Sequence, residues 1–120
     1  MLIKTKNKNH IFIKIEDFLG YKPRRNDYKW VVDENGIVHI TVPKFSGKYG
    51  RILCKILRKD ECFTVNLDRI GSTVWLNCDG EKTVKDILEV LKNVYPDQEN
   101  LDQRLYLFLQ EMRTLNYVTY

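Results

Sequence analysis

The sequence predicts an α+β domain, with a small three-stranded antiparallel sheet followed by three helices. Three observations lead to this class. An Asn-Gly pair separates two runs of alternating residues, a third such run follows, and the second half of the chain carries three segments of helical period. With 120 residues, of which 43% are hydrophobic and 30% charged, the chain can bury one modest core and is too apolar to be disordered.

The first 27 residues are predicted to form an N-terminal extension, and residues 28–120 the domain itself. The segment IFIKIEDFLGY has no clear period, and KPRRN follows it. The extension is expected to pack on the domain through Ile11, Ile13, Phe18 and Leu19. No stretch is apolar enough for a signal peptide or long enough for a membrane span, so a cytoplasmic protein without a membrane partner is expected.

Residues 28–43 predict a β-hairpin. Apolar residues recur at every second position, at Tyr28, Trp30 and Val32 and again at Val38, Ile40 and Val42. The intervening Glu34-Asn35-Gly36 turns the chain, because Asn and Gly both tolerate positive φ. His39 and Thr41 are then expected to face away from the core.

The two halves of the chain differ in charge. Residues 1–59 have a balance of +9 and residues 60–120 a balance of −5, within a net charge of +4. The basic half could attract a polyanion or an acidic partner, but a solvated lysine-rich surface is the preferred interpretation. A short basic helix is predicted at about residues 49–58, and it is interpreted as an ordinary helix laid on the sheet, since it is too short for stable membrane binding.

The third strand is predicted at Cys62–Leu67. Phe63, Val65 and Leu67 are expected to face the core, and Thr64 and Asn66 the opposite side. Asp68 or Asn66 is expected to cap a helix that begins near residue 69. Asp79-Gly80 should end that helix, because glycine accepts the left-handed conformation common at helix ends.

The second helix is predicted to start at a capping box, Thr83-Val84-Lys85-Asp86, and to end before Pro96. The third is predicted at about residues 101–115. Their core faces are expected to comprise Val84, Ile87, Leu88, Leu91, Val94 and Tyr95, and Leu101, Leu105, Phe108, Leu109, Met112 and Leu115. Residues 117–120 either add a terminal strand or cover the core. This order of elements is that of a winged-helix-like domain.

The run LDRIGSTVWLNCDGEKTVKDILEVL, followed by RLYLFLQEMRTLNYV, resembles the PqqD family. The resemblance covers about residues 60–118 and rests on the order and spacing of Leu67, Asp68, Gly71, Trp75, Asp79, Gly80, Thr83, Val84, Ile87, Phe108, Leu109 and Leu115. The N-terminal extension and the basic segment 44–59 lengthen this chain beyond compact members. Asn116 replaces the glycine usual near the end of the last helix, and it too tolerates the left-handed conformation.

The resemblance implies a non-catalytic peptide chaperone, also called a precursor-peptide recognition element. Members bind the leader of a ribosomally made precursor peptide and present its core to a modifying enzyme, typically a radical SAM enzyme. The best-known member serves pyrroloquinoline quinone biosynthesis. The leader adds as a strand to the third strand of the sheet and lies in a groove against the last helix.

The residues implied as peptide-binding are Phe63, Thr64, Val65, Asn66, Arg104, Leu107, Phe108 and Glu111. On the strand, the backbone is expected to matter more than the side chains of Phe63 and Val65, which are interpreted as core. On the last helix, Leu107 lies off the core stripe between Arg104 and Glu111. It is either a groove wall or an ordinary exposed leucine.

The alternative function is that of a winged-helix nucleic-acid-binding protein. The second and third helices offer Lys, Arg, Asn and Gln for base contacts, but they also carry acidic residues and lie in the net acidic half. Nucleic acid is therefore not the preferred partner. Nothing in the sequence indicates an oligomeric state.

No enzymatic activity, metal or cofactor is expected. The two histidines, His10 and His39, lie in no recognisable motif. Cys54, Cys62 and Cys78 fit no metal spacing and are interpreted as buried or incidental thiols.

Overall fold

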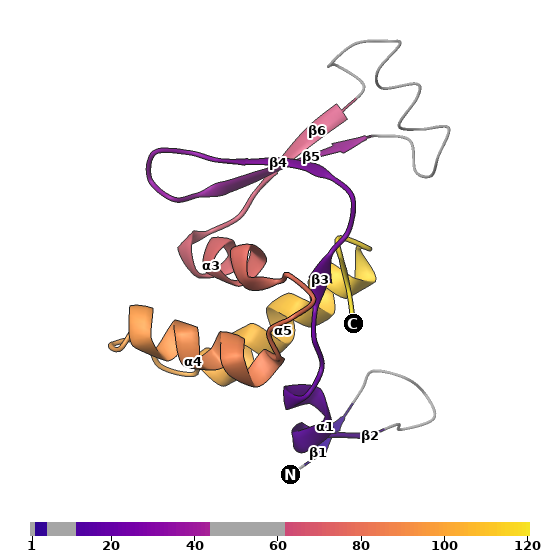
Figure 1. Cartoon of the computed structure of the whole chain (residues 1–120), viewed down its shortest axis with the longest axis vertical. Helices are drawn as coiled ribbons and strands as arrows, with labels where there is room; N and C mark the ends of the chain where they lie inside the picture. Colours follow the sequence, from indigo (N-terminus) through magenta and orange to yellow (C-terminus); the bar gives the residue numbers. More distant parts are fainter. Residues whose placement is uncertain (1, 5–11, 44–61) are drawn as a thin grey trace. The chain divides into compact units, whose positions relative to one another are not determined.

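A computed structural model of the chain describes residues 2–4, 12–43 and 62–120, and its architecture is α+β (Figure 1). The helix expected at residues 49–58 and the side chain of Cys54 lie outside the described residues. The elements in chain order are β1 (Leu2–Lys4), β2 (Phe12–Lys14), α1 (Ile15–Leu19), β3 (Arg24–Arg25), β4 (Lys29–Val32), β5 (Val38–Pro43), β6 (Cys62–Asn66), α3 (Arg69–Asn77), α4 (Val84–Val94), α5 (Leu101–Thr114) and β7 (Val118–Thr119).

Contacts within the chain divide it into two compact units. The helical unit comprises Met1–Asn26 with Leu76–Tyr120, and the sheet unit comprises Asp27–Trp75. The sheet unit holds a three-stranded antiparallel sheet, and the helical unit holds α4 and α5. The predicted fold class is confirmed, and the elements are compatible with a small winged-helix-like fold. The division into an extension of residues 1–27 and a domain of residues 28–120 stays a prediction.

The sheet has the strand order β4-β5-β6, and the predicted hairpin is β4-β5. The chain reverses at Gly36, whose φ is +79°. The carboxylate of Asp33 accepts hydrogen bonds from the N–H groups of Asn35 and Ile37, at 2.8 and 3.0 Å, which holds the turn. The Asn-Gly signal therefore predicted the turn correctly.

The core of the sheet unit lies between one face of the sheet and α3. Val38, Ile40 and Val42 are buried, whereas His39 and Thr41 lie on the opposite face, as predicted.

The buried Ser72 hydroxyl of α3 accepts a hydrogen bond from the Val38 N–H at 2.9 Å. The fully buried Trp75 and the half-buried Trp30 form a T-shaped ring pair with centroids 6.2 Å apart. Asp68, one of the two predicted caps, accepts from the Gly71 N–H at 2.6 Å.

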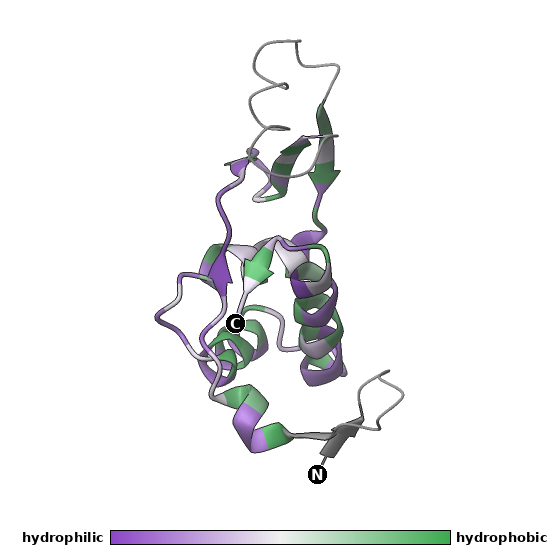
Figure 2. Cartoon of the chain, turned by 90° about the vertical axis from the view of Figure 1, so that its right-hand side faces the viewer, coloured by the Kyte–Doolittle hydropathy of each residue, from purple (hydrophilic) through white to green (hydrophobic). Residues whose placement is uncertain are grey.

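In the helical unit, the chain end returns as a strand. β3 and β7 pair antiparallel, with Arg24 opposite Thr119 (Figure 2), so the terminal strand left open by the sequence exists. Gly80, with φ at +79°, donates its N–H to the Pro23 carbonyl. A Cβ at Gly80 would lie 3.4 Å from the Arg24 side chain, so glycine serves both the turn and the close approach.

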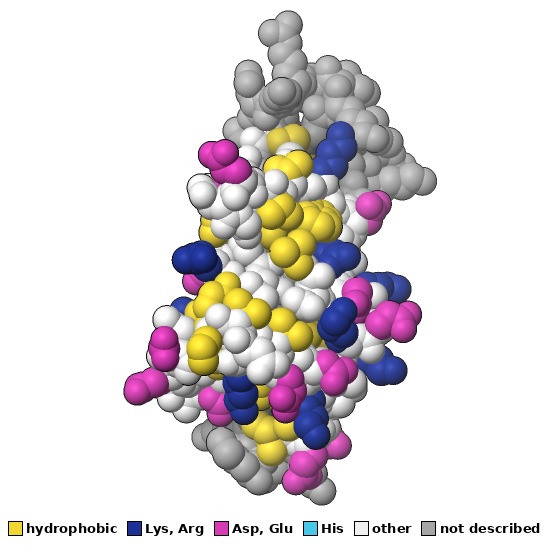
Figure 3. All heavy atoms as spheres, turned by 60° about the vertical axis from the view of Figure 1, so that its left-hand side comes forward, with side chains coloured by type: hydrophobic (Ala, Val, Ile, Leu, Met, Phe, Trp, Pro, Cys, Tyr) yellow, Lys and Arg dark blue, Asp and Glu magenta, His cyan; other side chains and the backbone are white. Residues whose placement is uncertain are grey.

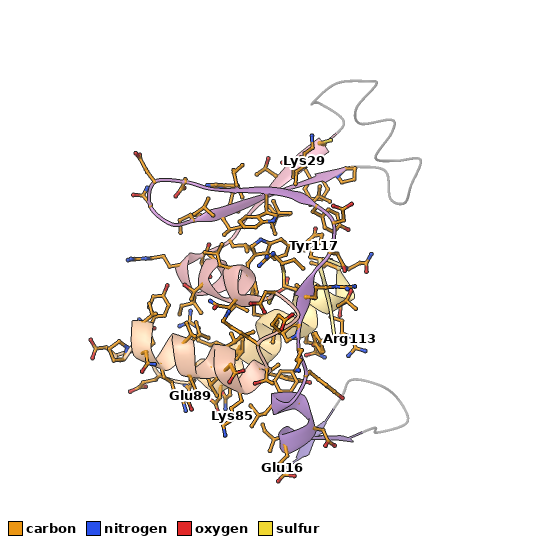
Figure 4. The ribbon with its side chains drawn as sticks, viewed as in Figure 1. Glu16, Lys29, Lys85, Glu89, Arg113 and Tyr117 are labelled. Atoms are coloured by element: carbon orange, nitrogen blue, oxygen red, sulfur yellow. The ribbon has the colours of Figure 1, made fainter. Side chains whose placement is uncertain are left out.

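Helices α4 and α5 each have an apolar and a polar side (Figure 2). Their buried residues are Val84, Ile87, Leu91, Leu101, Leu105, Leu109 and Met112. Lys85 and Glu89 are exposed on α4, one turn apart (Figure 4). The expected burial of Val94 and Leu115 is wrong, because they are 54% and 50% exposed. Val94 is the last residue of α4, and Leu115 lies where the chain leaves α5, just before Asn116 at φ +64°.

Phe18 of α1 is buried in the helical unit, as expected for the N-terminal segment. Its ring makes edge contacts with Tyr21, Tyr106 and Tyr120, with the closest centroid, that of Tyr106, at 5.2 Å. The guanidinium of Arg113 lies 4.9 Å from the centroid of Tyr120. Aromatic packing therefore joins the N-terminal segment to α5 and to the C-terminal residue.

The predicted capping box at α4 is present, and its removal should destabilise the protein. The Thr83 hydroxyl accepts from the Asp86 N–H at 3.1 Å, and the Asp86 carboxylate accepts from the Thr83 N–H at 3.0 Å. The second bond is the main cause of the lowered pKa of Asp86. Thr83→Ala should lower the free energy of unfolding by about 1 kcal/mol in urea titrations. Thr114→Ala, which removes only a hydroxyl bonded to the Gln110 carbonyl, is the control and should change it by less than about 0.5 kcal/mol.

Candidate functional site

β6 is an edge strand of the sheet. The order β4-β5-β6 gives it β5 as a neighbour on one side, and within residues 2–4, 12–43 and 62–120 no strand pairs with its other side (Figure 1). An edge strand leaves main-chain N–H and C=O groups free to pair with another chain. β6 therefore meets the requirement of the predicted strand addition, which needs an open sheet edge.

The register identifies which β6 groups face the open side. The Leu67 N–H donates to the Val38 carbonyl at 3.0 Å, so this pair is of the hydrogen-bonded kind. Bonded and non-bonded pairs alternate along an antiparallel ladder, so Phe63 and Val65 also direct their main-chain groups at β5. Thr64 and Asn66 direct theirs away from β5, toward the open edge.

The side chains of β6 divide between two faces. Thr64 and Asn66 are exposed and Val65 is half-buried, as expected from the alternation. The expectation that Phe63 belongs to the core is wrong, since it lies on the core face opposite Val42 but is 44% exposed. α3 contacts the strands at Val38 through the Ser72 hydroxyl and at Trp30 through the Trp75 ring. Figure 3 shows hydrophobic side chains at the surface in the region of the strands.

The second half of the predicted site is a row of residues on α5. Leu107 is 61% exposed, which confirms that it lies off the core stripe. Arg104 and Glu111 are exposed on the same side, three residues before and four after Leu107. The guanidinium of Arg104 donates to the Gln98 side-chain oxygen at 3.1 Å, and Phe108 is half-buried.

These two halves belong to different units. Phe63, Thr64, Val65 and Asn66 come together on β6 in the sheet unit. Arg104, Leu107, Phe108 and Glu111 come together on α5 in the helical unit. That they line one groove stays a prediction.

A polar cluster centred on His39 was missed by the sequence reasoning, which treated this residue only as part of the solvent-facing side. Its Nδ1 lies 2.6 Å from Asn66 Oδ1, and its Nε2 lies 2.9 Å from Asp33 Oδ2. The strand register places His39 directly opposite Asn66. This contact was not predicted, because the pairing of β5 with β6 cannot be read from local sequence. The cluster links the hairpin turn to the end of the candidate strand.

Hydrogen bonding shifts the ionisation of this cluster. The contact with Asn66, followed by that with Asp33, raises the pKa of His39 above its ordinary value. The hydrogen bond from His39 is the main cause of the lowered pKa of Asp33. The raised pKa of His39 gives stability that is fully present below the pKa of the unfolded chain and is lost as pH rises through the folded pKa. The lowered pKa of Asp33 gives stability that is lost as pH falls through its folded pKa.

The described cysteines have the character of structural thiols. Cys78 is buried, and burial raises the pKa of its thiol to about 12, so it is protonated at neutral pH. Cys62 on β6 is half-exposed, and both are free of disulfide bonds. Among the described residues, no group of three or more His, Cys, Asp or Glu side chains is arranged to hold a metal ion.

Comparison with known proteins gives one result. A search of the curated proteins and a search of the solved structures each found no match. The family model described as coenzyme PQQ synthesis protein D (PqqD) matches residues 57–118, just over half of the chain. This stretch includes β6, α3, α4 and α5, the elements that carry both halves of the candidate site. The chain therefore belongs to the PqqD family.

Proposed function

We propose that this protein is a non-catalytic carrier of a ribosomally made precursor peptide. It binds the peptide's leader by strand addition to β6 and presents the peptide to a modifying enzyme of the radical SAM type. The observation that carries the proposal is the outward direction of the main-chain groups of Thr64 and Asn66 on an edge strand. Membership of a family named for coenzyme PQQ synthesis supports it.

Main-chain pairing supplies affinity, and the side chains beside it supply specificity. A visiting strand that exchanges hydrogen bonds with Thr64 places alternate side chains on the two faces of the sheet. On the core face these side chains meet the exposed ring of Phe63 and the half-buried Val65. On the helical unit, the exposed Leu107 of α5, flanked by Arg104 and Glu111, is proposed as a further apolar contact for the peptide.

The chemistry of the described side chains suits a carrier more than a catalyst. The Cys78 thiol is buried and protonated, so it is a poor nucleophile. Both ring nitrogens of His39 are already engaged by Asn66 and Asp33. The partner enzyme then performs the reaction on the peptide.

No helix in the described part of the chain has the length and apolar character needed to cross a membrane.

Amide hydrogen exchange with and without peptide tests the proposal. The probe is a short precursor peptide, which the proposal expects to be encoded beside this gene together with a radical SAM enzyme. Saturating peptide should increase protection at the amides of Thr64 and Asn66, by about tenfold or more. The amides of Phe63 and Val65, which already face β5, should change little.

The opposite edge of the same sheet provides an internal control. The Asp33 N–H donates to the Ile37 carbonyl, so the alternation directs the main-chain groups of Trp30 and Val32 away from β5 on β4. Peptide should leave the exchange of these two amides unchanged. Protection at β4 in place of β6, or no binding of the peptide at all, would contradict the proposed function.

A further inference from the structure

The imidazole of His39 joins parts of the chain from both sides of β5 on the sheet face away from the core. Nε2 contacts Asp33, which follows β4, and Nδ1 contacts Asn66, the last residue of β6. His39 and Asn66 form a non-hydrogen-bonded pair, in which opposite side chains approach most closely. Both atoms facing the ring are oxygens, so this arrangement suits a ring that donates from both nitrogens, which is the imidazolium form.

Loss of one proton has a defined consequence for this arrangement. The Asp33 carboxylate is a pure acceptor and is held in place by the Asn35 and Ile37 N–H groups. The remaining ring proton therefore stays on Nε2, where it donates to Asp33. Nδ1 becomes an acceptor, and the Asn66 side-chain amide must rotate by about half a turn so that its NH₂ group faces the ring.

We propose that protonation of His39 switches the Asn66 side chain between hydrogen-bond donor and acceptor at the open edge of β6. With the imidazolium, Asn66 Oδ1 faces His39, and the amide NH₂ is available at the edge. With neutral His39, the amide oxygen is available there instead. Asn66 is exposed, and its main-chain groups also face this edge, so a visiting strand meets whichever group is presented.

The switch predicts which ligand side chains suit the position beside Asn66. Below the pKa of His39 the exposed NH₂ favours an acceptor, such as the carboxylate of Asp or Glu. Above it the exposed oxygen favours a donor, such as the ammonium of Lys. This consequence for the ligand rests on the proposed function, whereas the switch is a property of the free protein.

Other charged groups near His39 come from each neighbouring element. β4 contributes Lys29, two positions from Val31, which is the residue directly opposite His39. The turn contributes Asp33 and the exposed Glu34. Beyond β6, Asp68 is engaged as the cap of α3 through the Gly71 N–H. Of these, Asp33 contacts the ring, so it is the charge that selects the tautomer.

Nitrogen NMR of the labelled 120-residue chain, without peptide, tests the switch in a titration from about pH 5 to about pH 9. In the acidic form both ring nitrogens of His39 should be protonated. In the alkaline form only Nε2 should be, and a coupling across the hydrogen bond should link Nδ1 to the Asn66 side-chain nitrogen. A neutral ring protonated on Nδ1, or an Asn66 amide whose resonances do not titrate with His39, would overturn the proposal.

Two variants sharpen this test. Asn66→Asp presents only acceptors, so it should raise the pKa of His39 and keep the imidazolium to higher pH. Asp33→Asn should lower that pKa and remove the preference for the Nε2 tautomer. An unchanged tautomer preference in Asp33→Asn, with the fold intact by its amide spectrum, would count against the role given to Asp33. If this variant does not fold, the titration of the wild-type chain still decides the question.

A peptide experiment separates the switch from the proposed function. The precursor peptide is compared with versions carrying Glu or Lys at the position that lies beside Asn66. The ratio of their affinities should change by about tenfold across the pKa of His39. A constant ratio would show that the exposed group does not select the ligand. Absence of all peptide binding would instead count against the proposed function and leave the NMR result on the free protein standing.

Discussion

Trp75→Ala is expected to lower the free energy of unfolding by about 3–5 kcal/mol, a large part of the 5–15 kcal/mol typical of a small domain. Trp75 is completely buried, and its ring packs edge-on against Trp30 of β4. Truncation to alanine loses the transfer free energy of the indole and leaves a cavity between α3 and the sheet. It also removes the ring contact that ties β4, an edge strand, to the helix.

The neighbouring residue gives a matched control. Leu76 lies on the same helix but is 42% exposed, so Leu76→Ala should cost less than about 1 kcal/mol. Urea unfolding followed by far-UV circular dichroism measures both variants. A cost for Trp75→Ala similar to that of Leu76→Ala would mean that α3 does not hold the sheet in the way its burial indicates.

The parts of the fold that sequence predicted correctly have local causes. The Asn-Gly turn depends on residues that tolerate positive φ, and Gly36 adopts it. The capping box depends on residues three apart, Thr83 and Asp86, and both of its hydrogen bonds form. Asn116, interpreted as a substitute for glycine, has a φ of +64°. Each of these signals acts within a few residues, so no tertiary information was needed.

The errors occur where burial depends on what packs against an element. Helical periodicity placed Val94 and Leu115 on core faces, but both lie at helix ends and are about half exposed. Strand alternation placed Phe63 on the correct face without showing how far α3 covers that face. Periodicity predicts the direction in which a side chain points. Its exposure depends on how far the element packed against it extends over that side chain.

For the candidate site too, local patterns predicted some features, and others depended on tertiary structure. The alternation of Thr64 and Asn66 is local, and it was sufficient to predict their exposure. That β6 is an edge strand came from the family resemblance, and the strand order agrees with it. The partnership of His39 with Asn66 joins residues 27 positions apart, so it depends on a register that no short pattern encodes.

Thr64→Pro is expected to weaken binding of the precursor peptide by at least about tenfold, because it removes one main-chain hydrogen bond to the visiting strand and adds a steric clash. Proline is tolerated on an edge strand where its missing N–H faces outward, and the N–H of Thr64 faces the open side. The preceding residue, Phe63, is extended, as a residue before proline prefers. The variant should therefore remain folded, with a far-UV spectrum and a urea midpoint close to those of wild type.

The neighbouring position distinguishes loss of binding from loss of fold. Val65 directs its N–H at β5 opposite Ile40, so Val65→Pro removes a hydrogen bond of the native ladder and leaves a carbonyl unpaired, at a cost of about 1–3 kcal/mol or more. Thr64→Ala keeps the N–H and should retain binding by calorimetry. Proline should thus act on binding at residue 64 and on stability at residue 65. Full peptide binding by a folded Thr64→Pro protein would contradict pairing of a visiting strand at residue 64, because that pairing uses the main-chain N–H that proline lacks.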